Sequence, residues 1–131
     1  MSWDVLLLRL PGDAASMEEL PDGWAPPPLG RRQEVLAAVR EAAPEADLSD
    51  PSWGELLGAG WSMELGMGSE DPVDTVMLHI RGRGDGVLPH VLRLADALGC
   101  KALDLSTGSF LAAGDTAGWH AFQAYRDRVV G

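Results

Sequence analysis

The sequence has few residues of several types, and each shortage excludes a class of protein. Its 131 residues contain one cysteine, so an internal disulfide and any zinc site built from cysteines are excluded. That residue, Cys100, lies between a helical pattern and a strand pattern, which indicates a packed thiol rather than a nucleophile. The apolar run from Val5 to Leu8 is too short for a signal or membrane segment. We therefore expect a cytoplasmic protein that does not bind membranes.

Basic residues are also scarce, and they are missing from the middle of the chain. Residues 1–80 hold 15 acidic and 4 basic side chains, whereas residues 81–131 hold 5 acidic and 6 basic ones. Between Glu41 and Ile80 there is no Lys or Arg, but there are nine carboxylates: Glu41, Glu45, Asp47, Asp50, Glu55, Glu64, Glu70, Asp71 and Asp74. Such a field repels nucleic acid and attracts cationic partners. The alternative is that this charge only maintains solubility.

The rest of the composition is typical of a globular domain. Hydrophobic residues make up 46% of the chain and charged residues 23%. A chain of 131 residues is close to the common size of one domain, which buries roughly two-thirds of its unfolded surface. We therefore predict a single domain that spans residues 1–131.

Hydrophobic periodicity predicts four main strands. Trp3–Leu10 is apolar on both faces, which favours a position inside the sheet. Trp61–Met67 and Val76–Ile80 alternate strictly on either side of a polar turn, which predicts an antiparallel hairpin. Lys101–Leu105 is the fourth strand, and Glu55–Leu57 is expected to add a short edge strand before the hairpin.

Helical spacing of apolar residues predicts three helices. The first covers residues 31–43 and the second residues 88–98. Residues 11–30 are rich in Pro and Gly and predict a long acidic loop, and residues 47–54 have the composition of a turn. The last helix is predicted to begin near Thr116 as its N-cap, with an apolar side formed by Trp119, Phe122, Tyr125 and Val129.

The order of these elements predicts the topology. The chain reads strand, helix, strand, strand, helix, strand, helix, and the first six elements match the pattern of ferredoxin-like domains. In that topology the first strand lies inside the sheet, as its two apolar faces require. We therefore predict an α+β fold: a ferredoxin-like βαββαβ antiparallel sheet with an additional C-terminal helix.

A glycine-rich segment between a strand and a helix is the first candidate for ligand chemistry. Gly82, Gly84 and Gly86 lie where backbone amides can cradle a phosphate. Their spacing departs from the dinucleotide and P-loop fingerprints, and Asp85 would repel a phosphate. A flexible turn accounts better for these glycines, and we expect no cofactor.

The histidines are the second candidate. His79, His90 and His120 are not at metal-ligand spacing, so no metal site is predicted. Glu64, His79 and Arg81 would meet on the outer sheet face if the hairpin register allows it. A carboxylate that orients an imidazole is the minimum for acid–base catalysis, but cross-strand ion pairs commonly use the same residues. We predict that the protein is not an enzyme.

Tryptophan is frequent, with five residues in the chain. Trp3, Trp61 and Trp119 fall on predicted core stripes, so packing explains them. Trp24 and Trp53 lie in acidic loops, where an exposed aromatic ring can act as a hot spot for protein binding. The alternative is that each of these two rings anchors its own loop.

Four segments resemble a group of small uncharacterised bacterial proteins. They are Met1–Asp4, Asp50–Gly54, Met77–Gly82 and Leu103–Gly108. Those proteins look like the acidic immunity partners that are encoded beside secreted polymorphic toxins. The resemblance implies inhibition by tight binding, and it carries no residue-level functional motif.

The sequence thus predicts an intracellular binding or inhibitor protein that neutralises a cationic toxin domain by occluding it. Neither nucleic acid nor a membrane is expected to be a partner. An alternative is a small-ligand-binding or dimerising domain of bacterial metabolism or regulation, including a homodimer through the sheet face that carries His79. A third hypothesis is an enzyme that uses Glu64 and His79. The predicted partner-binding residues are Trp24, Asp47, Asp50, Trp53, Glu64, Glu70, Asp71 and Asp74.

Overall fold

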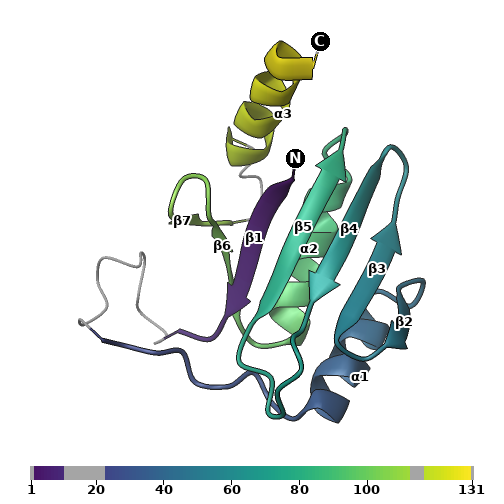
Figure 1. Cartoon of the computed structure of the whole chain (residues 1–131), viewed down its shortest axis with the longest axis vertical. Helices are drawn as coiled ribbons and strands as arrows, with labels where there is room; N and C mark the ends of the chain where they lie inside the picture. The colour runs from purple at the N-terminus through teal and green to yellow at the C-terminus, as the bar shows by residue number, and fades with distance from the viewer. Residues whose placement is uncertain (1, 11–22, 113–116, 131) are drawn as a thin grey trace.

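The computed structural model describes residues 2–10, 23–112 and 117–130 (Figure 1). Within these ranges the chain forms an α+β fold, with a seven-stranded antiparallel sheet and three helices. The elements in chain order are β1 (Trp3–Leu8), α1 (Arg32–Ala42), β2 (Asp47–Asp50), β3 (Trp53–Leu57), β4 (Trp61–Gly66), β5 (Val76–Gly82), α2 (Val87–Ala97), β6 (Lys101–Asp104), β7 (Ser109–Phe110) and α3 (Ala117–Val130). None of the helices in the described ranges has the length and apolar character needed to cross a membrane.

The strands lie in the order β2-β3-β4-β5-β1-β6-β7. Strand β1 pairs with β5 on one side and with β6 on the other, which confirms the interior position predicted from its two apolar faces. The predicted hairpin is also present, because β4 and β5 pair from Trp61↔Gly82 to Gly66↔Met77. Of the predicted loop 11–30, residues 11–22 lie outside the described residues.

The sheet is wider than the sequence indicates. The predicted edge strand Glu55–Leu57 is part of β3, but β3 is not an edge, since β2 pairs along its outer side. Strand β2 occupies a segment that was expected to be a turn, so that expectation was wrong. Its only buried residue is Leu48, which packs so closely that a Cβ on Gly54 would lie 2.8 Å from Leu48 Cδ2. A strand with one buried side chain has no periodicity to detect.

One face of the sheet carries the core. Helices α1 and α2 pack against it, behind the strands in Figure 1. Alternate residues of each strand point toward the helices and are buried, as in the pattern of β4 and β5. Each fully buried Leu, Val or Ile contributes about 1.5–3 kcal/mol through the hydrophobic effect. The opposite, outer face therefore receives the intervening polar residues of the same strands.

Helix α3 docks at the end of β1 through one buried ring. Trp119 is 0% exposed, its ring centroid lies 5.2 Å from that of Trp3, and its Nε1 donates to the Gly84 carbonyl at 3.0 Å. Phe122, the next residue of the predicted apolar side, is half-buried and packs against the core, but Tyr125 and Val129 are exposed, so that prediction was wrong for the second half of the helix. Figure 1 shows the reason: α3 projects beyond the end of the sheet. The predicted N-cap at residue 116 lies outside the described residues.

A buried carboxylate supports this junction. Asp104, which is 1% exposed, accepts hydrogen bonds from Trp3 Nε1 at 3.1 Å, Ser106 N at 2.9 Å and Ser106 Oγ at 2.6 Å. Its Oδ2 approaches the first turn of α3 so closely that a Cβ on Gly118 would lie 1.9 Å away. Burying a carboxylate is costly unless it is hydrogen-bonded, and all three of these donors bond to Oδ1. Asp104 thus links β1, β6 and the start of α3.

Candidate functional site

Several carboxylates gather at one end of the sheet, where three segments meet. Backbone hydrogen bonds hold the segments together: Leu29 N donates to the Val73 carbonyl at 2.8 Å, Val73 N to Gly30 at 2.9 Å, and Met67 N to Ser52 at 2.9 Å. The start of α1, the β2–β3 turn and the β4–β5 loop therefore lie side by side (Figure 1). We call their carboxylates the acidic end: Glu34, Asp50, Glu70, Asp71 and Asp74.

Arg32 is the main cation at the acidic end, but its guanidinium is directed at the backbone. It donates to the carbonyl oxygens of Pro51 at 2.6 Å, Gly68 at 2.7 Å and Glu70 at 2.5 Å. Arg32 therefore ties the β2–β3 turn to the β4–β5 loop. None of the ion pairs among the described residues involves a carboxylate of the acidic end. These carboxylates are exposed and make no ion pair within the described residues, although the charge of Arg32 contributes to lowering the pKa of Asp50.

The start of α1 lies within this group. Asp71 Oδ1 accepts the Arg32 N–H at 3.0 Å, and Glu34 Oε1 accepts the Arg31 N–H at 3.3 Å. Both carboxylates thereby satisfy amides that a helix N-terminus leaves without an intrahelical partner. An open cavity of about 530 Å³ lies between them, lined by Gly30, Arg31, Glu34, Asp71 and Pro72. The acidic end is thus partly concave.

Two aspartates of β2 are held in the ionised form by neighbouring serines. The backbone N–H of Ser52 and then its hydroxyl lower the pKa of Asp50, at 2.9 Å and 2.7 Å. The backbone N–H and hydroxyl of Ser49 lower the pKa of Asp47 in the same way, at 3.0 Å and 2.7 Å. Hydrogen bonds to the charged form favour it, so both groups keep their charge as the pH falls.

We expect Ser52→Ala to raise the pKa of Asp50, because one donor to the carboxylate is lost. Carboxyl carbon NMR titration measures this, and Ser49→Ala is the matched control, which should move Asp47 alone. A group with a depressed folded pKa adds stability above its unfolded pKa and loses it as the pH falls through the folded pKa. Wild type and Ser52→Ala should therefore converge in stability at low pH. An unchanged Asp50 titration would contradict the assignment of its donors.

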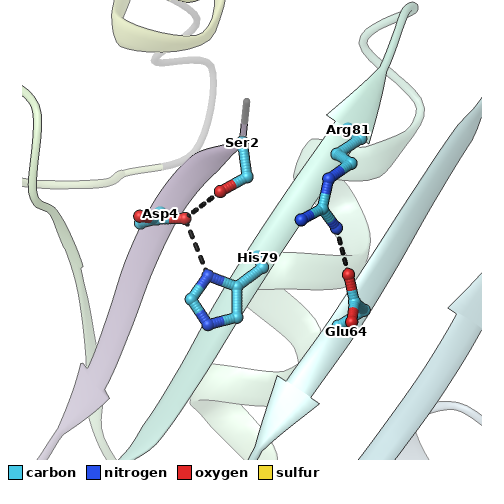
Figure 2. A network of polar contacts seen from close by, with 5 residues as sticks. All are labelled: Ser2, Asp4, Glu64, His79 and Arg81. Carbon is cyan, nitrogen blue, oxygen red and sulfur yellow. Dashed lines mark hydrogen bonds and ion pairs between the residues drawn. The ribbon is translucent and has the colours of Figure 1, made fainter.

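The outer face carries a separate polar network, shown in Figure 2. Asp4 Oδ1 accepts a hydrogen bond from Ser2 Oγ at 2.6 Å and lies 2.9 Å from His79 Nδ1. Arg81 forms an ion pair with Glu64. The hairpin register does bring Glu64 opposite His79, as predicted, but the carboxylate that contacts the imidazole is Asp4, directly across on β1. Asp4 could not be predicted as this partner from the sequence, because its position depends on the pairing of β1 with β5.

This network has the geometry of cross-strand pairing. The hydroxyl of Ser2 donates to the carboxylate and not to the imidazole, so these residues do not form a nucleophile–base pair. The other side of His79 is occupied by Trp53, whose ring stacks on the imidazole at a centroid distance of 5.9 Å and an angle of 25°. Asp4 and Trp53 together fix the orientation of His79.

The remaining predicted partner-binding residues lie in different places. Trp53 is 38% exposed on the outer face and pairs across the turn with Asp50, so it borders the acidic end. Asp47 lies on the edge strand β2, opposite Glu55. Trp24 is half-buried, and no ring contact or hydrogen bond among the described residues connects it to the acidic end. The structure thus brings Trp53 to the acidic end but does not bring Trp24 there.

The glycine-rich loop at residues 82–86 contacts helix α3. Trp119 Nε1 donates to the Gly84 carbonyl, Arg126 donates to the Gly82 carbonyl, and His120 Nε2 lies 2.8 Å from Asp85 Oδ1. The loop therefore presents carbonyl oxygens and a carboxylate, which do not suit a phosphate. Among the described residues, no three His, Cys, Asp or Glu side chains are grouped as metal ligands.

The thiol of Cys100 is half-buried, and burial raises its pKa to about 12. Because the thiolate is the reactive form, and a thiolate of higher pKa is more nucleophilic, we expect the folded protein to react with a disulfide reagent at neutral pH roughly 30- to 60-fold more slowly than the unfolded chain. The rate of thionitrobenzoate release measures this, with an unstructured peptide around Cys100 as the control. Equal rates for folded protein and peptide would show that the thiol is accessible and unperturbed.

Comparison with known proteins finds no relative of this chain. No protein-family model matches the chain, and neither a curated protein nor a solved structure matches it. The residues and contacts described above are therefore the basis for the function proposed below.

Proposed function

We propose that this protein is an intracellular inhibitor that binds a basic protein and occludes it, as the immunity partners of secreted polymorphic toxins do. The observation that carries the proposal is the acidic end, whose five carboxylates make no ion pair within the described part of the chain. The resemblance of four segments to small uncharacterised bacterial proteins that look like immunity partners agrees with this proposal, as does the net charge of −10.

Electrostatics supports the choice of a basic partner. Exposed charges interact over roughly 8 Å at physiological ionic strength, so grouped carboxylates act together on an approaching cation. Such a field raises association rates by about 10- to 1,000-fold and disfavours acidic partners such as nucleic acid. Within the acidic end, Ser52 lowers the pKa of Asp50, so this carboxylate keeps its charge to a lower pH than an aspartate without these hydrogen bonds.

We also propose a ferredoxin-like unit at the centre of the fold. Strands β6, β1, β5 and β4 are neighbours in that order, and α1 and α2 pack on one face. Strands β2 and β3 extend this unit at one edge and β7 at the other. In this arrangement β2 and β3 add the turn that carries Asp50, so the extension builds part of the acidic end.

Co-expression with the product of the neighbouring gene tests the proposed function. We expect that product to be a basic toxin domain, to form a stoichiometric complex on size-exclusion chromatography, and to arrest growth unless this protein is present. The three readouts together support the proposal. A neighbouring product that neither binds nor arrests growth contradicts it.

A further inference from the structure

The indole of Trp53 lies across the outer face in a fixed position. Gly66 is opposite Trp53 in the β3–β4 ladder, and a Cβ on Gly66 would lie 3.4 Å from Trp53 Cζ3. The indole thus lies against Gly66 of β4 and stacks on His79 of β5. The ring is therefore held between two strands while 38% of the residue stays exposed. An aromatic ring fixed in this way is prepared for stacking at little entropic cost.

Carboxylates adjoin this ring on the same face. Glu55 is two residues after Trp53 on β3, so both side chains point outward. Glu55 lies directly opposite Glu64, and like charges in that position destabilise a sheet. Arg81 pairs with Glu64, but within the described residues no cation pairs with Glu55. The face thus holds an uncompensated carboxylate beside an exposed indole.

A hollow next to these residues has room for one side chain. It measures about 190 Å³ and is lined by Glu55, Leu57, Ser62, Met63 and Glu64. For comparison, a cavity of about 150 Å³ accommodates a benzene molecule. Leu57, the last residue of β3, is 74% exposed at its rim. The hollow therefore combines an acidic wall with an apolar one.

We propose that this surface receives an arginine side chain of the basic partner. We call the surface the arginine site, defined by Trp53, Glu55, Leu57 and Glu64. The planar guanidinium would stack on the indole and donate two hydrogen bonds to the free Glu55 carboxylate, while its methylene groups cover Leu57. Charge complementarity selects the cation, and the flat ring favours arginine over lysine. The identification of the partner rests on the proposed function, but the recognition of arginine does not.

A small probe tests the site without the partner. We expect N-acetyl-arginine-amide to shift the NMR signals of the Trp53 indole N–H and of the Glu55 and Leu57 amides in a saturable way. The isosteric neutral N-acetyl-citrulline-amide should leave them unchanged. Glu55→Gln should abolish the arginine response, whereas Glu41→Gln, the same change on the outer surface of α1, should preserve it. Equal responses to both probes, shifts elsewhere, or signals that change only with protein concentration, as in a homodimer through this face, would overturn the proposal.

Measurement with the partner separates this inference from the proposed function. With the toxin product, Trp53→Ala should weaken binding by about 30-fold, in the range of a hot-spot residue, and Glu41→Gln should have no effect. Trp53→Phe is the control for a folding defect in Trp53→Ala. It keeps an aromatic ring on the outer face and should therefore lose less affinity than Trp53→Ala. If neither Trp53→Ala nor Glu55→Gln changes the affinity for the toxin product, the arginine site is contradicted, but the proposed inhibitor function is not. If the protein binds N-acetyl-arginine-amide but no toxin partner, the arginine site is supported and the proposed inhibitor function is contradicted.

Discussion

Replacing Trp119 with alanine is expected to lower the free energy of unfolding by about 3–5 kcal/mol, the range for deleting a buried tryptophan from a core. The ring is 0% exposed, packs on Trp3 at 5.2 Å and stacks on Phe122 at 5.8 Å. Its removal also leaves the Gly84 carbonyl without its donor. Because Trp119 is the fully buried anchor of α3, the helix should detach from the sheet in this variant.

Chemical denaturation monitored by circular dichroism measures this effect. Trp53→Ala is the matched control, since it removes the same side chain from a partly exposed position and should cost clearly less than Trp119→Ala. Hydrogen exchange should show early loss of protection in α3 for the Trp119 variant only. Similar losses for both variants would mean that Trp119 does not anchor the helix.

The second large effect concerns association with the basic partner. Neutralising Asp50, Glu70 and Asp74 to Asn, Gln and Asn should slow association by about 10- to 100-fold at low salt, because steering depends on the grouped charge. The difference should shrink as salt screens the field. Stopped-flow fluorescence or biolayer interferometry at several ionic strengths measures the association rate. The Asn side chain at position 50 keeps an acceptor for the Ser52 donors, so the turn is preserved.

A matched triple variant keeps this test specific. Glu41, Glu45 and Asp96 are exposed carboxylates away from the acidic end, and neutralising them makes the same change in net charge. We expect this control to associate nearly as fast as wild type. If both triple variants slow association equally, net charge alone matters and the acidic end is not the docking surface.

The parts of the fold with repeating patterns could be predicted from the sequence. The strict alternation of Trp61–Met67 and Val76–Ile80 predicts the β4–β5 hairpin, and the two apolar faces of Trp3–Leu10 predict an interior strand. Strand β2 could not be predicted, because Asp47, Ser49 and Asp50 have turn chemistry and only Leu48 is buried. The side chain of Asp47 accepts a local hydrogen bond from Ser49 within the strand, and that of Asp50 accepts one from Ser52 in the following turn, so a segment with turn composition forms a strand.

The candidate site could be predicted only in part for a related reason. The charge pattern between Glu41 and Ile80 indicates an acidic surface, and the structure groups four of its nine carboxylates with Glu34, which that pattern did not include, whereas Glu41 and Glu45 lie elsewhere. Asp4 could not be predicted as the partner of His79, because the residue opposite it on the neighbouring strand depends on register and not on local sequence. The position of Trp53 over Gly66 likewise depends on the pairing of β3 with β4. Sequence patterns describe single elements, whereas these contacts arise between elements.

The central claim is that the acidic end, bordered by Trp53, is where the basic partner docks. Hydrogen exchange of the complex, compared with the free protein, tests it most directly. We predict that the partner protects backbone amides in residues 50–57 and 67–74 and leaves the exposed surfaces of α1 and α2 beyond their first turns unchanged. Protection confined to the helical layer or to α3, with no change in residues 50–57 and 67–74, would contradict the account.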